Sequence, residues 1–191
     1  MERNLRQVRS SESKFKTRED GKDLHIEGYF AVFNSNYNIF EGASESVDPH
    51  AFDNTLEGDI RALTNHDTSL VLGRTTAGTL KLHTDSHGLY GDITINPNDQ
   101  DAMNLYARVQ RGDVNQCSFG FEIRNEETEF LEDGSVHWTI KDVDLFEVSV
   151  CTFPAYEETN VLARKKDVED IKKRKHEAWV IRMKEKLKKG N

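Results

Sequence analysis

The stretch QCSFGFEIRN, residues 116–125, alternates between apolar and small or polar side chains, as expected for a β-strand. The apolar face of this strand would carry Cys117, Phe119, Phe121 and Ile123, and the opposite face Ser118, Gly120 and Glu122. The hydroxyl of Ser118 is therefore expected to point away from the core. A glycine two residues later leaves that side open to another backbone or to a substrate.

Several segments around this strand have the same period of two and are bounded by Gly, Asn, Asp or Ser. We expect strands within residues 24–33, 61–65, 70–74, 78–84, 88–95, 136–140 and 144–153, with a hairpin turn in the acidic stretch 126–135. So many short strands in close succession predict an antiparallel sheet or barrel.

Two helices are expected to flank the strands. Residues 48–58 have Asp48 as a possible cap, Pro49 at the first helical position and Gly58 as a stop. The segment 96–112 has Asn98 or Asp99 as its cap and ends at Gly112, with Ala102, Leu105, Tyr106 and Val109 on one face. The fold class is therefore mainly β with flanking helices, an α+β arrangement.

The charge distribution predicts three parts: a mobile leader, residues 1–22; a folded domain, residues 23–160; and a basic helical tail, residues 161–191. The tail holds 12 Lys and Arg against 5 Asp and Glu, a net charge of +7, whereas the first 160 residues hold 14 against 29, a net charge of −15. An acidic body is a poor surface for nucleic acid, so only the tail is expected to make weak contacts with DNA.

The composition also excludes several classes of protein. A hydrophobic fraction of 36% is too high for a fully disordered chain. No apolar stretch approaches the roughly 18 residues that cross a bilayer, and the N-terminus lacks the apolar core of a signal peptide. Two cysteines are too few for a disulfide framework. The sequence thus indicates a soluble, unsecreted protein in a reducing compartment.

Three residues could carry chemistry. His66 lies in TNHD at the end of an expected strand, and histidine is the side chain best suited to accept and release a proton at neutral pH. Ser118 could be a nucleophile, and Glu147 lies on the side of its strand opposite the apolar row of Phe146, Val148 and Val150. Each residue could equally have a structural role, as a surface histidine, a strand serine and a solvated acid.

Other constellations are weaker. His83 and His87 are four residues apart, but KLHTDSHGL is expected to form a strand, a turn and a strand, which does not place them on one helical face for a metal ion. Cys117 should point into the core, where a thiol is less reactive. We therefore expect neither a metal nor a cofactor.

The blocks GYFAVFN, DPHAF, TNHD, LGRTTAGTLKL, RGDVNQCSFGFEI and VDLFEVSVCTFPAY resemble, in this order, those of the prohead (head maturation) proteases of tailed bacteriophages. The resemblance covers roughly residues 24–160. It implies a serine endopeptidase with His66 as base and Ser118 as nucleophile. This family looks related to the herpesvirus assembly protease, which implies an antiparallel β-barrel with flanking helices.

The viral relative uses a second histidine as its third catalytic residue, and this chain has none at the matching place. Glu147 fits that position best, with Asp144 second and Asp142 third. An acid there would hold the imidazole through a charge-assisted hydrogen bond. Backbone N–H groups near residues 152–155 are the first choice for the oxyanion donors, and Arg74 is a weaker one.

The resemblance also implies partners and a place of action. The substrates would be scaffold (delta-domain) segments and the major capsid protein precursor, cut inside the assembling procapsid in the host cytoplasm. Self-processing would fall near residues 10–22 and 160–175, and a homodimer is conceivable by analogy with the viral relative. The rival hypothesis is a non-catalytic β-barrel that binds scaffold or capsid protein, with Ser118 and His66 as bystanders.

Overall fold

The computed structural model describes residues 6–153 without a gap, together with separate residues near the C-terminus. The chain divides into two compact units, Met1–Tyr156 and Glu157–Asn191. In the second unit every described residue is helical: 168, 169, 173, 176, 177, 179–181, 183 and 184. Within the described residues, no helix has both the length and the apolar character needed to span a bilayer.

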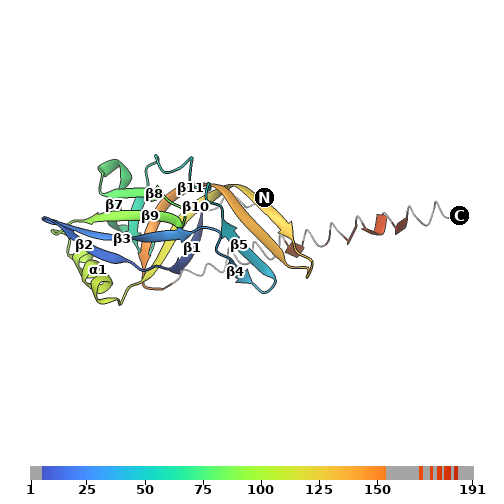
Figure 1. Ribbon diagram of the computed structural model, residues 1–191, viewed down its shortest axis with the longest axis horizontal. Coiled ribbons are helices and arrows are strands. Elements are labelled where there is room, and N and C mark those ends of the chain that lie inside the picture. Colours follow the sequence, from blue (N-terminus) through green and yellow to red (C-terminus); the bar gives the residue numbers. More distant parts are fainter. Residues whose placement is uncertain are drawn as a thin grey trace. The chain divides into compact units, whose positions relative to one another are not determined.

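Two long strands dominate the first unit. β10 (Gln116–Phe130) and β11 (Val136–Cys151) form an antiparallel hairpin, drawn as the long yellow and orange ribbons of Figure 1. β1 (Gln7–Glu12) pairs antiparallel with the other edge of β10. The expected strand at 116–125 is confirmed, and it extends further than its apolar pattern.

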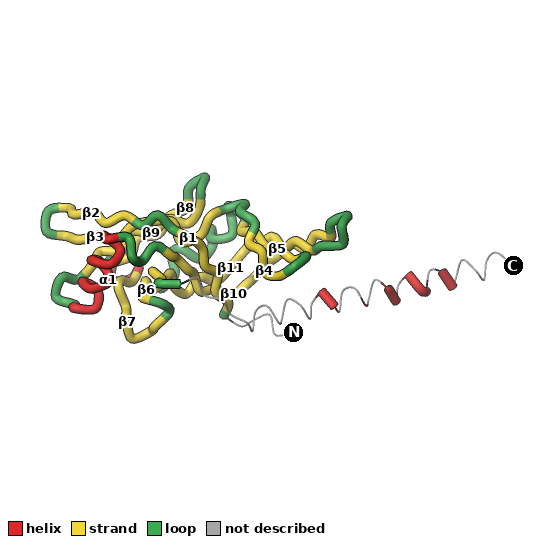
Figure 2. Tube along the Cα trace, turned by 90° about the horizontal axis from the view of Figure 1, so that it is seen from below, coloured by secondary structure: helices red, strands yellow, loops and turns green. Residues whose placement is uncertain are grey.

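The free edge of β11 pairs with two different strands in succession. β5 (Ala43–Val47) runs parallel to its first part and β6 (Arg61–Thr64) runs parallel to its last part. β4 (Tyr37–Phe40) pairs antiparallel with β5, and β7 (Asp67–Arg74) pairs antiparallel with β6. Figure 2 shows the two pairs at opposite ends of the hairpin. The β6–β7 pair lies beside the segment of β11 that contains Glu147.

The second sheet is an antiparallel meander in the order β2 (Lys16–Asp20), β3 (Asp23–Val32), β9 (Gly88–Ile95) and β8 (Leu80–Thr84). A short 3₁₀ turn, Thr75–Ala77, precedes β8. The two sheets share one hydrophobic core, to which they contribute Ile26, Phe30, Leu89, Ile93, Phe119, Phe121, Val148 and Val150. Burial of these side chains is the main force that holds the sheets together.

α1 (Gln100–Arg111) forms where its sequence predicts a helix and lies beside the second sheet (Figure 1). Asp99 is the N-cap and accepts hydrogen bonds from the backbone N–H groups of Asp101 and Ala102. Gly112 ends the helix in the left-handed region, with φ of 87°. The helix packs its four predicted apolar residues into the core.

The structure corrects the expected antiparallel barrel. The strands form two separate sheets, one of them mixed, and in the described residues they do not close into a barrel. The reason is that β11 is long enough to pair with β5 and β6 one after the other in parallel. A period-two pattern reports strands but not which edges will pair.

The prediction of a mobile leader is also wrong for residues 7–12 and 16–20. Residues 7–12 form β1 and residues 16–20 form β2, so order begins well before Leu24. Both strands are polar, and each lies at the edge of its sheet. Backbone pairing with β10 and β3, rather than an apolar pattern, holds these residues in place.

Two local predictions differ from the structure. Residues 49–58 form successive turns with hydrogen bonds between residues three apart, such as Thr55 N–H to Phe52 O, rather than a regular α-helix. In β11 a bulge interrupts the register between the pairs Gly120–Glu147 and Phe121–Leu145. Phe146 is the extra residue of that bulge, and its side chain is exposed instead of joining the apolar row.

Candidate active site

His66 lies in a tight turn between β6 and β7. Thr64 pairs with Asp67, so the loop consists of Asn65 and His66 alone, with positive φ angles of 52° and 62°. Two positive φ values are typical of a type I′ hairpin turn, whose second position favours glycine. A histidine at that position adopts a backbone conformation unfavourable for a residue with a Cβ.

Several hydrogen bonds hold this turn against the last part of β11 and the residue after it. The backbone N–H of Asn65 donates to the Val150 carbonyl at 3.1 Å, and its side-chain oxygen accepts from the backbone N–H of Thr152 at 2.8 Å. The backbone N–H of His66 donates to the hydroxyl of Ser149 at 3.2 Å. The imidazole is thus positioned by backbone contacts as well as by its own ring atoms.

Glu147 is the partner of the imidazole. Its Oε1 lies 2.7 Å from Nδ1 of His66, and its Oε2 accepts a hydrogen bond from the Ser149 hydroxyl at 2.6 Å. Arg6 forms an ion pair with Oε1 at 3.0 Å. Glu147 is only 1% exposed, so this carboxylate is buried and paired on both oxygens.

The environment of Glu147 favours its ionised form. Burial acts to raise the pKa of this carboxyl, but the hydrogen bonds from His66 and Ser149 and the electrostatic interactions with His66 and Arg6 outweigh it. The net effect is a lowered pKa. An ionised acid at Nδ1 leaves Nε2 of His66 as the ring atom that can take up a proton.

Ser118 lies directly across the sheet from this group. In the β10–β11 register, Ser118 is opposite Ser149 and Gly120 is opposite Glu147. Directly opposed side chains of an antiparallel pair lie on the same face. Because Ser149 binds the backbone of His66 and the carboxylate of Glu147, Ser118 adjoins the residue that links the other two predicted site residues.

The Ser118 hydroxyl is buried, with 0% exposure, although the strand pattern correctly places it on the face opposite the aromatic core. It donates to the backbone carbonyl of Arg9 at 2.9 Å and accepts from the hydroxyl of Ser10 at 2.9 Å. Both partners belong to β1. Two residues of the expected leader therefore make hydrogen bonds with the hydroxyl that is expected to act as nucleophile.

The hydrogen bonds of Ser118 go to β1 and not to the imidazole of His66. The Nε2 atom of His66 instead lies 3.8 Å from the sulfur of Cys151. A direct bond between the hydroxyl and the imidazole requires the hydroxyl to turn away from the Arg9 carbonyl. In this structure Ser118 and His66 are therefore bonded to different partners.

Gly120 accommodates the buried acid. A Cβ at this position would lie 2.3 Å from Oε1 of Glu147 and 3.0 Å from Nε of Arg6. The space that the sequence pattern suggested for a backbone or a substrate is filled by the carboxylate. A glycine at this position therefore lets β10 and the acid share one face of the sheet.

The other acids and the arginine proposed from sequence lie elsewhere. Asp144 pairs with Arg124, and Asp142 accepts a hydrogen bond from Asn54 at 3.4 Å. Arg74 forms two bonds of 2.6 Å to Asp59 and so keeps the pKa of that carboxyl low.

The expected oxyanion donors at residues 152–155 fall partly outside the described chain. The Thr152 N–H is already bonded to Asn65, residues 154 and 155 are not described, and Pro154 has no N–H to offer. The donors near the end of β11 are therefore fewer than the sequence suggested.

Neither cysteine has the environment of a nucleophile. Burial, followed by the charge of Glu147, raises the pKa of Cys151 to about 12. Burial also raises the pKa of Cys117, which lies in the core as its strand pattern predicts. Both thiols are kept protonated and weakly reactive.

The rings of His83 and His87 pack against tyrosines: the first is tilted over Tyr90 with centroids 5.2 Å apart, and the second meets Tyr29 edge-on with centroids 4.4 Å apart. Over the described residues, no group of three or more His, Cys, Asp or Glu side chains is arranged to hold a metal ion.

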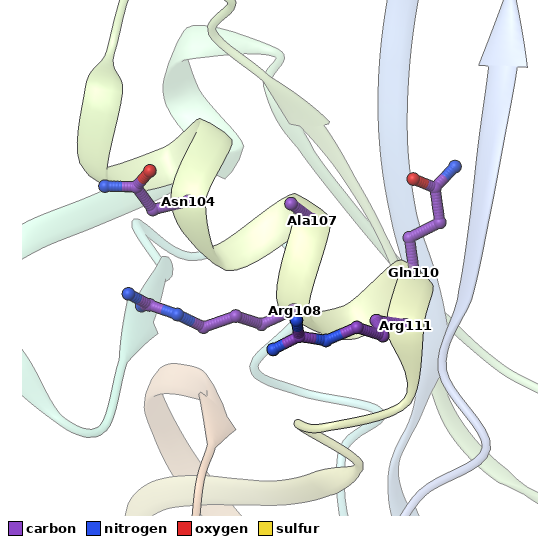
Figure 3. A pocket seen from close by; sticks show the side chains of 5 residues that line it. All are labelled: Asn104, Ala107, Arg108, Gln110 and Arg111. Carbon is purple, nitrogen blue, oxygen red and sulfur yellow. The ribbon is translucent and has the colours of Figure 1, made fainter.

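Two surface hollows lie in the first unit. One opens beside the imidazole and is lined by Asn65, His66, Cys151, Thr152 and Phe153, the last of which is 79% exposed. The other is lined by five residues of α1: Asn104, Ala107, Arg108, Gln110 and Arg111 (Figure 3). Of these two, the first adjoins the His66–Glu147 pair.

Sequence reasoning missed the positioning roles of Ser149, Asn65 and Arg6. A signal existed for Ser149, because its alternation with Glu147 in β11 puts both on one face. Asn65 tolerates positive φ better than most residues, and an Asn-His pair between two strands could have indicated a tight turn. Nothing in the local pattern around Arg6 indicates a contact 141 positions later.

The sequence matches the family model of the caudovirus prohead serine protease over residues 11–174. The chain belongs to this family. It is 32% identical over 158 residues to the prohead protease of Enterobacteria phage HK97, which covers 81% of this chain and 66% of that protein. The chain thus spans slightly less than two thirds of that relative.

The fold is similar to the bacteriophage T4 capsid assembly protease gp21, with a TM-score of 0.51 over 76% of this chain and 96% of that one. At 9% identity the likeness concerns the fold alone.

Proposed function

We propose that this chain is a serine endopeptidase in which Ser118 is the nucleophile, His66 the general base and Glu147 the acid that orients the imidazole. The observation that carries the proposal is the buried Glu147 carboxylate bonded to Nδ1 of His66, with Ser118 opposite the bridging Ser149. An acid, an imidazole and a hydroxyl in this order are the parts of a serine hydrolase site.

The roles follow from the atoms that each group presents. His66 takes the Ser118 proton through Nε2 while Glu147 stabilises the positive charge that forms on the ring. The Ser118 oxygen then attacks the carbonyl carbon of a peptide bond, and the leaving amine receives the proton. Water then attacks the carbonyl carbon of the acyl group with His66 again as the base, and the new carboxylate and the Ser118 hydroxyl are released.

Substrates are proposed from the relatives. Those proteins are named for the prohead and for capsid assembly, which favours precursor segments of scaffold and major capsid protein as the peptides cut, inside the assembling procapsid. The contact between β1 and Ser118 favours self-processing in addition. The site needs an extended peptide, because Ser118 lies on a strand whose outer edge pairs with β1.

The test is co-expression of the full chain with the capsid precursor of its own phage, followed by mass measurement of the products. The parent chain and the control Ser135→Ala, whose hydroxyl bonds to Asp133 in the turn after β10, should cut the precursor. Ser118→Ala and His66→Ala should leave it intact. Equal cutting by Ser118→Ala would move the nucleophile elsewhere, and an intact precursor in every case would favour a binding module.

A further inference from the structure

β1 crosses Ser118 in the manner of a bound peptide. It runs antiparallel to β10 from Gln7, opposite Phe121, to Glu12, opposite Gln116. The Ser118 oxygen lies 2.9 Å from the carbonyl oxygen of Arg9. This carbonyl group belongs to the Arg9–Ser10 peptide bond. In an extended segment, the side chain before this bond points to the face opposite that of Ser118.

That side chain is largely buried against an acid, Glu45, and an aromatic ring, Phe121; these two residues are named the Glu45 pocket. The Arg9 guanidinium binds both carboxylate oxygens of Glu45, through Nε to Oε1 and through a terminal nitrogen to Oε2 at 2.9 Å. It lies over the ring of Phe121, with its central carbon 5.6 Å from the ring centre. The Arg9 side chain is 11% exposed and that of Glu45 is 0% exposed.

We propose that Glu45 selects a basic side chain at the residue whose carbonyl Ser118 attacks, and that Arg9 fills this pocket as the first substrate. The inference rests on the proposed function of Ser118. A buried carboxylate is costly unless a cation pairs with it, so a peptide with Arg or Lys at this position restores a pairing that a neutral or acidic one does not. Arginine fits best, because its fork matches two carboxylate oxygens.

The reaction on the chain itself would be an ordinary hydrolysis. The Ser118 oxygen forms a bond to the Arg9 carbonyl carbon, the bond from that carbon to the Ser10 nitrogen breaks, and His66 delivers the Ser118 proton to the new amine. Water then converts the acyl group to the Arg9 carboxylate. For this to begin, the Ser118 hydrogen bond must switch from the Arg9 carbonyl to Nε2 of His66.

The bond is held out of reaction in the present state by that same hydrogen bond and by the Ser10 hydroxyl, which donates to the Ser118 oxygen. Cutting after Arg9 would release its guanidinium from Glu45, so that a basic side chain of an incoming peptide could take its place. The pocket would then act first on the chain and afterwards in trans.

The first arm of the test reads the N-terminus of the purified full chain by mass spectrometry. The parent, Arg9→Lys and the control Arg18→Gln, which alters a surface cluster on β2, should begin at Ser10. Ser118→Ala should keep residues 1–9. Arg9→Glu should cut this bond roughly 100-fold more slowly, because it puts a second acid beside Glu45.

The second arm covers the case in which Arg9→Glu fails to fold. Peptides that copy residues 4–15, with Arg, Lys, Gln or Glu at position 9, are given to the parent chain, and the cut is located by mass. Arg and Lys should exceed Glu in kcat/KM by roughly 100-fold, and Glu45→Gln should narrow that ratio at least tenfold.

The two proposals can fail separately. If the chain cuts the capsid precursor but treats the four peptides alike, or cuts them at another bond, Glu45 does not set specificity and the protease assignment stands. If neither precursor nor peptides are cut, both proposals fall together.

Discussion

Glu147 and His66 are joined through Oε1 and Nδ1 at 2.7 Å, although they lie 81 positions apart in the chain. The contact exists because β6 pairs in parallel with the last part of β11, so that the turn after β6 arrives beside Glu147. This pairing is the structural basis of the proposed site.

Glu147→Gln should lower kcat by about 10,000-fold while leaving the shape of the site intact, because the amide no longer stabilises a charged imidazole. Peptide cleavage under steady-state conditions measures this. A loss of less than tenfold would show that the acid is structural only. Asp144→Asn is the matched control, since Asp144 pairs with Arg124 and does not contact His66.

The same variant should change the acid stability of the fold. The pKa of Glu147 lies below its ordinary value of 4.5 in the folded state, so its ionisation stabilises the fold above that pH. This contribution is lost as the pH falls through the folded pKa. Between pH 7 and pH 3 the unfolding free energy should therefore drop more for the parent chain than for Glu147→Gln. Urea denaturation at the two pH values measures this, and an equal drop in unfolding free energy for both chains would contradict the predicted direction.

His66→Gly should be more stable than His66→Ala by about 1 kcal/mol, because φ of 62° is unfavourable for a residue with a Cβ but not for glycine. Both variants lose the imidazole and the bond to Glu147, so only the backbone term differs between them. Both should be inactive. Urea denaturation of the pair measures the difference, and a less stable glycine variant would mean that the turn is not strained.

Gly120→Ala should reduce activity per folded molecule at least tenfold, because its Cβ would displace the Glu147 carboxylate. The control is Gly91→Ala, whose Cβ would lie 2.6 Å from the Phe30 ring in the other sheet. Both should cost roughly 1–3 kcal/mol of stability. Only the first should impair cleavage, as measured by active-site titration alongside the fraction folded.

Cys151→Ala should still cleave peptide, and iodoacetamide at pH 8 should not inactivate the parent chain. Burial and the nearby Glu147 raise the pKa of this thiol to about 12, so it stays protonated. Its sulfur lies 3.8 Å from Nε2 of His66, which makes it the obvious rival nucleophile. Rapid inactivation with alkylation at Cys151 would contradict this prediction.

The strands with an apolar alternation, and α1, were predictable because their signals are local. Phe119 and Phe121 alternate with small residues, and Asp99 and Gly112 bound an amphipathic helix. β1 gave no such signal, because its residues are polar and it is held by pairing with β10 and by the ion pair from Arg9 to Glu45. An edge strand of this kind is specified by its partner and not by its own pattern.

The proposed site also has features that the sequence predicts and features that it does not. The alternation in β10 and β11 places Ser118, Glu147 and Ser149 on the faces away from the core, and these faces are correct. Their exposure was not predictable, because the cover over Ser118 comes from residues 9 and 10, more than a hundred positions away. The choice of Glu147 over Asp144 and Asp142 as the partner of His66 likewise depends on the β6–β11 pairing.

The sequence by itself determined the strands with an apolar alternation, which of their side chains share a face and which family the blocks resemble, since these depend on neighbours a few positions apart. Only the tertiary structure decided that two sheets replace a barrel, that Glu147 meets His66, and that Arg9 lies in the Glu45 pocket across Ser118. The physical reason is that edge pairing and buried ion pairs join segments far apart in the chain, and no local pattern records the partner.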